Sequence, residues 1–424
     1  MSEIKQGYKQ TKVGIIPEDW DVVKVGEKFD FLKTYSNSRE DLNNIDEISY
    51  IHYGEIHTKH KFYIDFAKFE LPKINKSKLP NEIIFAQNGD LVIADASEDY
   101  ADIGKSAEIK NLTSKAVSGL HTFLLRDKNN NFVDGYKGYL LYNEIVARSI
   151  KKIATGISVL GISKTNLSKL EIPLPPLKEQ EKIAQILTTW DEAITKQTEL
   201  LEAKELQKKA LMQKLLSGEV RFDGFSDKWE EVRIDKLFDF KKGQELSKEK
   251  LEKNGIFECI LYGELYTTYS EVISEIKSKT NIKEGIKSKI DDILIPASTT
   301  TSAIDLAIAS TIQKDNVLIG GDINILRKKT NNINGEFISK YLTHIKKMEI
   351  AKYAQGITII HLYSKDFKHL KIQLPSLPEQ QKIAEVLSLA DDEINLLKNE
   401  LEELKLQKKA LMQKLLTGQV RVKV

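Results

Sequence analysis

The chain lacks several features that would place it outside the cell or in a membrane. It has one cysteine, Cys259, so an internal disulfide is excluded and a reducing compartment is indicated. Cys259 lies in the apolar run 256–261 and is predicted to be an inert core thiol. No apolar run approaches the roughly 20 residues of a membrane span, and the first residues lack a secretory signal pattern. We therefore expect a cytoplasmic protein without a membrane partner.

Charge of one sign is also missing, since the net charge is +2 although 30% of the 424 residues are charged. A basic face for a polyanion would have to come from local lysine clusters or from partner subunits. The length is enough for two or three domains of ordinary size.

Catalytic motifs are missing as well. Gly104-Lys105-Ser106 resembles the end of a phosphate-binding loop, but the glycine required earlier is Asp99. Asp95 with Glu108-Ile-Lys110 imitates a nuclease cluster, yet the second half of the chain does not repeat it. The histidines have no zinc spacing, and no Gly-x-Gly-x-x-Gly or Asn-Pro-Pro-aromatic motif occurs. The sequence therefore predicts a non-catalytic chain that holds no metal or cofactor of its own.

What the chain does have is an internal repeat. The segment 206–221 returns almost unchanged as 406–421, and 174–184 returns as 374–384, each 200 positions later. Between these segments only landmarks recur, such as Trp20 with Trp229 and Tyr53-Gly-Glu with Tyr262-Gly-Glu. We interpret Tyr53 and Tyr262 as turn and core residues. Each repeat thus joins a variable globular part to a constant part, which suggests a target with two similar halves.

The constant parts are predicted to be long coiled-coil helices, because apolar residues recur in alternating steps of four and three. Polar residues interrupt the first seam at Gln197, Lys204 and Lys208 and the second at Lys408. Ser376-x-x-Glu379 has the spacing of a capping box, and Gly218 and Gly418 are predicted helix stops. The predicted apolar seam consists of Ile183, Leu187, Trp190, Ile194 and Leu201 in the first helix and Ile383, Leu387, Ile394, Leu397, Leu401 and Leu404 in the second.

The linkers indicate the direction of these helices. Only about ten residues join Gly218 to Trp229, so the second globular part begins where the first helix ends. Antiparallel packing satisfies this short link and gives an approximate two-fold axis, whereas parallel packing would need a long return along the helices. We predict recognition domains at 1–174 and 219–374, helices at 175–218 and 375–418, and a tail at 419–424.

The globular parts are predicted to be mixed α/β domains. Strands are expected at 90–94, 122–125, 292–295 and 323–326, where short apolar runs are bounded by Gly, Asp and Asn. Helices are expected at 138–152 and 336–352.

Polar and basic loops occur at three matching places in the two halves: 33–39 with 241–244, 97–100 with 298–301, and 151–158 with 352–358. Lys, Arg, Ser and Thr can hold phosphates, while Gln, Asn and Arg can read base edges. Solvated loops without a ligand are the alternative. The candidate DNA-binding residues are Lys33, Ser36, Arg39, Ser97, Tyr100, Lys151, Lys152, Thr155 and Ser158 in the first half, and Lys241, Lys242, Gln244, Ser298, Thr299, Thr300, Lys352, Gln355 and Thr358 in the second.

With these motifs together, the chain resembles a DNA specificity subunit of a type I restriction-modification system. The resemblance rests on Ile16-Pro-Glu-Asp-Trp20, Gly161-Ile-Ser-Lys164, Leu174-Pro-Pro-Leu-Lys-Glu-Gln180 with its second copy at 374–380, and the repeated helix ends. The second half departs at Tyr363, which replaces Ser163. Lys164 and Lys365, which stand in these motifs, join the candidate DNA-binding residues.

The resemblance implies that two target-recognition domains each read one half of a split, asymmetric sequence in double-stranded DNA, and that the helices set the spacer. It also implies two modification subunits that use S-adenosylmethionine to methylate adenine at N6. Restriction subunits with ATP and magnesium would complete the complex. One alternative is the specificity subunit of a related type IIB-like system, and another is a coiled-coil scaffold with two protein-binding domains.

Overall fold

The computed structural model describes residues 4–244 and 246–423. The chain divides into two compact units, unit 1 with Met1–Thr198 and Asn399–Val424, and unit 2 with Glu199–Lys398. Two long helices, α6 (Leu177–Ser217) and α12 (Leu377–Leu416), each contribute residues to both units. Unit 1 contains the start of α6 and the end of α12, and unit 2 contains the remaining parts. No helix among the described residues has the length and apolar character needed to cross a membrane.

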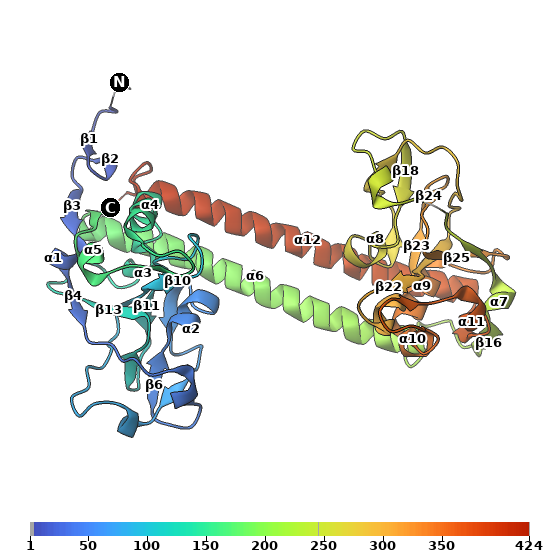
Figure 1. Ribbon diagram of the computed structural model, residues 1–424, viewed down its shortest axis with the longest axis horizontal. Coiled ribbons are helices and arrows are strands. Elements are labelled where there is room, and N and C mark those ends of the chain that lie inside the picture. Colours follow the sequence, from blue (N-terminus) through green and yellow to red (C-terminus); the bar gives the residue numbers. More distant parts are fainter. Residues whose placement is uncertain (1–3, 245, 424) are drawn as a thin grey trace. The chain divides into compact units, whose positions relative to one another are not determined.

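A five-stranded sheet forms the centre of the domain in unit 1 (Figure 1). Neighbouring strands are antiparallel except for one parallel pair, β11 with β7. In spatial order the strands are β4 (Phe29–Leu32), β13 (Thr122–Asp127), β9 (Leu91–Ala94), β11 (Ser106–Lys110) and β7 (Phe62–Asp65). A smaller sheet consists of β12 (Ala116–Ser118), β6 (Ile48–Ile51), β8 (Lys73–Ile74) and β5 (Leu42–Asn43).

Short strand pairs and helices complete this domain. The pairs are β1 (Tyr8–Thr11) with β2 (Gly14–Pro17), β3 (Asp21–Lys24) with β15 (Glu171–Leu174), and β10 (Ala96–Ser97) with β14 (Leu160–Gly161). The helices are α1 (Val25–Lys28), α2 (Tyr53–Thr58), α3 (Lys137–Leu140), α4 (Glu144–Ile153) and α5 (Lys164–Ser168), with 3-10 turns η1 (Arg39–Asp41) and η2 (Lys76–Lys78).

Unit 2 repeats this topology. Its five-stranded sheet has the order β17 (Phe238–Lys242), β25 (Ile323–Lys328), β21 (Asp292–Pro296), β23 (Ser310–Ile312) and β19 (Val272–Ile273), and again only the last pair is parallel. Its smaller sheet has β20 (Ser278–Thr280), β18 (Phe257–Ile260) and β24 (Leu318–Ile319). The mixed α/β class predicted for both globular parts is confirmed.

Most of the remaining elements of unit 2 have counterparts in unit 1. The strand pairs are β16 (Glu230–Arg233) with β27 (Lys371–Leu374) and β22 (Ser298–Thr299) with β26 (Ile360–His361). The helices are α7 (Ile234–Leu237), α8 (Glu264–Thr267), α9 (Gly335–His344), α10 (Lys347–Ala351) and α11 (Ser364–Phe367), with 3-10 turns η3 (Lys248–Lys250) and η4 (Ala303–Leu306).

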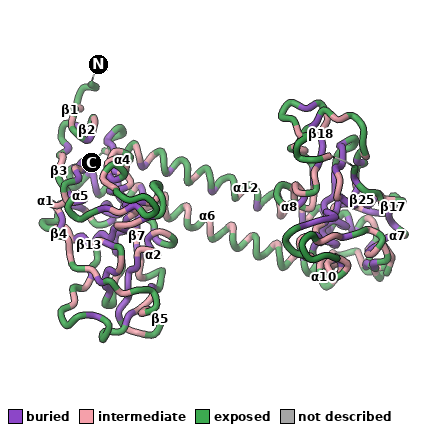
Figure 2. The backbone as a smooth tube through the Cα atoms, viewed as in Figure 1, coloured by how far each residue is buried: buried purple, intermediate pink, exposed green. Residues whose placement is uncertain are grey.

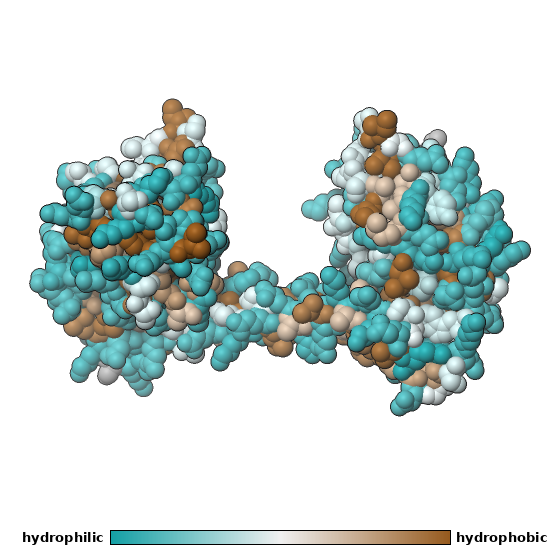
Figure 3. Space-filling model, turned by 90° about the horizontal axis from the view of Figure 1, so that it is seen from below, coloured by the Kyte–Doolittle hydropathy of each residue, from teal (hydrophilic) through white to brown (hydrophobic). Residues whose placement is uncertain are grey.

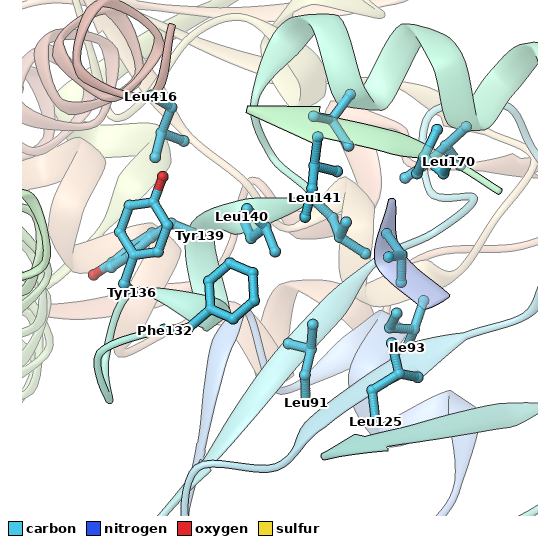
Figure 4. Close-up of a cluster of buried hydrophobic side chains, with 14 of the residues drawn as sticks. Leu91, Ile93, Leu125, Phe132, Tyr136, Tyr139, Leu140, Leu141, Leu170 and Leu416 are labelled. Atoms are coloured by element: carbon cyan, nitrogen blue, oxygen red, sulfur yellow. The ribbon is translucent and has the colours of Figure 1, made fainter. Parts of the chain in front are cut away.

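The central strand of each domain is buried on both faces, because it separates two apolar clusters. Leu91 and Ile93 of β9 face a cluster with Phe132, Tyr136 and Leu140, whereas Val92 and Ala94 face the opposite cluster. This follows from the period of two in a strand. Figure 4 shows the first cluster, and Figure 2 shows burial concentrated in the domain strands. The four predicted strands are confirmed as β9, β13, β21 and β25.

The two predicted domain helices are each broken, so these predictions were wrong in their extent. In unit 1 the expected helix 138–152 is α3 and α4, separated at Asn143. The Asn143 side chain caps α4 by accepting from the amides of Ile145 and Val146, and its amide donates to the Leu416 carbonyl at 2.5 Å. In unit 2 the expected helix 336–352 is α9 and α10.

The long helices run antiparallel within each unit. In unit 1 the Gln197 amide donates to Glu400 at 3.1 Å, and in unit 2 Lys204 pairs with Glu393 at 2.6 Å. All predicted seam residues are buried or half-buried. Gly218 and Gly418 follow the helices with φ of 75° and 71°, which confirms both as helix stops.

The first turn of each long helix holds a buried carboxylate. Glu179 accepts from the Trp20 indole at 2.8 Å and from Arg421 Nε at 2.7 Å, and both partners lie in unit 1. In unit 2 Glu379 accepts from Trp229 and Arg221 in the same way, at 3.2 and 2.8 Å. The predicted capping box at Ser376 is thus replaced by a carboxylate that ties the helix start to an arginine beyond the end of the other helix.

A second pair of carboxylates lies on the helix seam. Asp191 bonds to Lys408 and to the Tyr139 hydroxyl, and Asp391 bonds to Lys208 and, at 2.7 Å, to Lys340. The polar seam lysines are therefore paired across the helices. Lys340 has only 1% of its side chain exposed, and Asp391 is its salt-bridge partner.

The substitution Asp391→Asn should lower the free energy of unfolding by about 3 kcal/mol, because removing one partner leaves buried ammonium groups unpaired. Asp392→Asn is the matched control, since Asp392 is exposed one residue away. Denaturant unfolding measures both. Equal stability of the two variants would contradict the assigned pairing.

Burial shifts the pKa of several side chains in the domains, among them Cys259 and His60. Burial raises the pKa of the Cys259 thiol to about 11, and Cys259 is fully buried in β18, which confirms the inert core thiol. Burial lowers the pKa of His60, which lies between α2 and β7 with 3% exposure. Neither His60 ring nitrogen has a hydrogen-bond partner among the described residues.

Because the folded pKa of His60 lies below its unfolded value of about 6.5, the unfolded chain takes up the proton more readily. Stability should therefore fall as the pH is lowered through about 6.5. His60→Leu should reduce this loss, measured by unfolding at about pH 7.5 and about pH 5.5. An unchanged slope in His60→Leu would refute a buried neutral imidazole.

Candidate nucleic-acid interface

A cleft of about 490 Å³ opens in unit 1 beside α2. Its walls come from α2, from the loop after β10, from the start of β13 and from the hairpin before β14. The lining includes Tyr53, His57, Thr58, Ser97, Glu98, Asp99, Asp102, His121 and Val159.

The loop 96–105 on one wall is fixed to α2 at both of its ends. His57 Nε2 bonds to the Ala96 carbonyl at 2.9 Å, and Lys105 Nζ donates to the His57 carbonyl at 3.1 Å. Inside the loop, Asp99 Oδ1 accepts from the amides of Ala101 and Asp102 at 2.7 and 2.9 Å. These bonds hold the cleft wall in one conformation before any ligand binds.

Aromatic rings form another wall. Tyr53 packs edge-on against His57 and His121, with ring centroids 5.9 and 5.6 Å apart. Tyr53 is half-buried, and its counterpart Tyr262 has 42% exposure and lines the second cleft. Tyr262 lies in the turn before α8, which confirms it as a turn residue, but its exposure shows that it is not a core residue.

Unit 2 contains the equivalent cleft, with a volume of about 640 Å³. The lining is richer in hydroxyl groups and includes Tyr262, Tyr266, Thr267, Ser298, Thr299, Thr300, Thr301, Asp305, Asp322, Ile359 and His361. Thr301 donates to Asp305 Oδ2 at 2.5 Å, and the Tyr266 hydroxyl donates to the Ser298 carbonyl. The two clefts thus share their position and differ in their chemistry.

A tight hairpin forms the rim of each cleft. Thr155 pairs with Gly161 and Gln355 with His361. Gly156 and Gly356 have φ of 132° and 126°, and a Cβ at either would lie about 2 Å from a carbonyl oxygen, so the turn requires glycine. Lys151, Lys152, Thr155 and Ser158 are exposed along the first hairpin and the end of α4, and Lys352, Gln355 and Thr358 are exposed in unit 2.

The clefts bring together only part of the predicted site. Ser97, Ser298, Thr299 and Thr300 line them, but Ser97, Ser298 and Thr299 are only 5–8% exposed, which corrects their expected placement in open loops. Short strands β10 and β22 cause this burial. Tyr100 is 56% exposed and is not part of the cleft lining.

The first predicted loop pair lies elsewhere. Lys33 and Ser36 are exposed, and Arg39 pairs with the buried Glu55 of α2 at 3.2 Å. Lys242 and Gln244 line a separate pocket of about 690 Å³, while Lys241 is exposed at the end of β17. Lys164 and Lys365 are exposed and lie over the rings of Phe31 and Tyr363, at 5.4 Å in each case.

Neither cleft lining includes a lysine or arginine among the described residues. The exposed lysines nearest to the hairpins in sequence are Lys151 and Lys152 at the end of α4 and Lys352 after α10. One face of the molecule is largely hydrophilic with separate apolar groups (Figure 3). This arrangement suits phosphate contacts outside the clefts and base contacts inside them.

Sequence reasoning missed Glu98, Asp99, His57, His121 and Asp305 among the residues that line the clefts. Only the position of Glu98 and Asp99, inside the predicted loop 97–100, could have indicated any of them.

The nuclease-like residues do not converge on a site. Glu108 is fully buried in β11 and accepts from the amides of Gly135 and Gly138 at 2.7 and 2.9 Å. Asp95 instead faces His121 at 3.3 Å. No group of three or more His, Cys, Asp or Glu side chains that could hold a metal ion is found in the part of the chain that the structure describes.

Comparison with known proteins gives a consistent result. Residues 17–205 and 226–406 each match the family described as the type I restriction modification DNA specificity domain. The putative type I restriction enzyme MjaX specificity subunit of Methanocaldococcus jannaschii is 28% identical, and the alignment covers 99% of this chain and 98% of the relative. The type I restriction enzyme MjaVIII specificity subunit of the same organism is 25% identical, and the alignment covers 99% of this chain and 97% of the relative.

Solved structures show the same fold. The S subunit of a type I restriction-modification system from M. genitalium has a TM-score of 0.57 at 18% identity, covering 93% of this chain and 96% of that one. A chain from a structure of type I R-M complex assembly also has a TM-score of 0.57 at 16% identity. The match covers 96% of this chain and 99% of that one. With two matched domains, two equivalent clefts and two antiparallel long helices, this chain belongs to the type I restriction-modification DNA specificity family.

Proposed function

We propose that this chain selects the DNA sequence on which a type I restriction-modification complex acts, each domain reading one half of a two-part site. The observation that carries this proposal is the repeated cleft. Two domains of largely different sequence each present a cleft at the same place, with lysines exposed at the end of the neighbouring helix, Lys151 and Lys152 in unit 1 and Lys352 in unit 2. Conserved position with different lining is expected of two readers that recognise two different base sequences.

The chain supplies specificity, and its partners supply the chemistry. Two modification subunits would bring S-adenosylmethionine and methylate adenine at N6, and restriction subunits would bring ATP and magnesium. The repeated helix segments support equivalent docking places for two like subunits, and the continuous helices support a fixed spacer between the half-sequences. This activity belongs to the cytoplasm, where the DNA is.

The direct test combines the purified chain with its modification subunits and maps methylated adenines in genomic DNA. A split, asymmetric consensus is expected, with no methylation by the chain alone. A related system that cuts on both sides of its site would give the same kind of consensus, but its partner subunit would contain a nuclease domain. A protein scaffold would show no salt-dependent affinity for duplex DNA.

The exposed lysines beside the first cleft should contact phosphates. Replacing Lys151 and Lys152 with alanine should weaken binding to all sequences and flatten the dependence of log K on log salt by about one unit per lost contact. Lys228→Ala is the control, because Lys228 is exposed in the linker between α6 and β16. Equal salt slopes for all variants would exclude these lysines from the interface.

The fragment 1–221 should form a homodimer in which each copy supplies the missing helix end to the other. Unit 1 needs Lys408, Met412, Leu416 and Arg421 from α12 and the tail, and residues 208, 212, 216 and 221 are identical to them. With modification subunits the fragment should methylate a palindrome of the first half-sequence. A fragment that stays monomeric with the modification subunits present would show that helix α6 of one copy cannot replace the end of α12 in the other.

A further inference from the structure

The carboxylates of the first cleft differ in what they bind. Asp99 caps the loop amides, and Asp102 pairs with Lys105 at 2.8 Å. Glu98 lies between these residues and Ser97, is exposed, and makes no recorded hydrogen bond or ion pair with any described residue. It is therefore the one carboxylate of this lining whose oxygens are both available to a ligand.

The surroundings of Glu98 are already fixed. Its loop is attached to α2 through Ala96 and Lys105, and the Asp99 amide donates to Ser97 Oγ at 3.2 Å. A ligand would thus meet a carboxylate on a preorganised backbone, which reduces the entropy cost of binding.

An uncommitted negative charge is unfavourable beside phosphates, since no lysine or arginine is found in the lining formed by the described residues. It becomes favourable opposite an amine donor on a base edge. In the major groove, Glu and Asp pair with the cytosine N4 amine, whereas thymine presents an oxygen at the same place.

We propose that Glu98 reads a cytosine in the half-sequence recognised by the first domain, by accepting a hydrogen bond from its N4 amine. This rests on the proposed function and adds the base class to it. Among the described residues that line the second cleft, neither carboxylate is unpaired in this way, because Asp305 is bonded to Thr301 and Asp322 pairs with Lys242 at 3.5 Å. Its hydroxyl groups make the second reader chemically different.

The test is selection from a pool of duplex DNA with randomised positions, using the full chain with its modification subunits. Glu98→Gln should change one position of the first half-sequence from C·G towards A·T, because an amide pairs with adenine N6 and N7. The preference of the parent for cytosine over thymine at that position should fall by about 5- to 100-fold. The second half-sequence should be unchanged.

Glu18→Gln is the charge-matched control, since Glu18 is exposed outside the cleft, and both half-sequences should then be retained. An unchanged first half-sequence in Glu98→Gln would overturn the proposal, as would a change confined to a position that is A·T in the parent. If the parent itself selects no sequence, the proposed function fails instead. Retention of the other positions of the first half-sequence in Glu98→Gln shows that the first domain of the variant is folded, and an intact second half-sequence shows the same for the second domain.

Discussion

Each unit depends on antiparallel packing of the long helices, because the end of one helix completes the core at the start of the other. In unit 1, Met412, Leu415 and Leu416 of α12 belong to the same apolar cluster as Ile183 and Leu187 of α6. The buried Glu179 binds Arg421 and the half-buried Asp191 binds Lys408 across the same contact. Helix pairing and domain folding are therefore one process in each unit.

This dependence explains why part of the sequence is constant. Gln180 and Gln380 each donate to two loop carbonyls and accept one loop amide, so the repeated Glu-Gln pair joins the helix start to its domain. The positions that support the clefts use main-chain atoms in the same way. Of the side chains that face the clefts, some are the same in both units, such as Tyr53 and Tyr262, and others differ, such as Glu98 and Thr299.

Periodic features of the molecule could be predicted from the sequence, and local features could not. The heptad seam, the glycine stops and the apolar strands follow from burial on a repeating face. The break at Asn143 depends on a tertiary bond to Leu416, and the Glu379 carboxylate is bound by Arg221, which is 158 residues away. The exposure of Tyr262 and the lining role of Glu98 depend on how loops fold. The spacing of apolar and polar residues in the sequence does not determine these tertiary contacts and loop conformations.

The composition of the units has a consequence for synthesis on the ribosome. Unit 2 is one continuous stretch, Glu199–Lys398, whereas unit 1 needs Asn399–Val424 in addition to its first 198 residues. The domain translated first is therefore the last to be completed. Ile183 and Leu187 cannot pack against the end of α12 until unit 2 has been synthesised. Loss of the last few turns of the chain would consequently damage the amino-terminal domain rather than the one beside it in sequence.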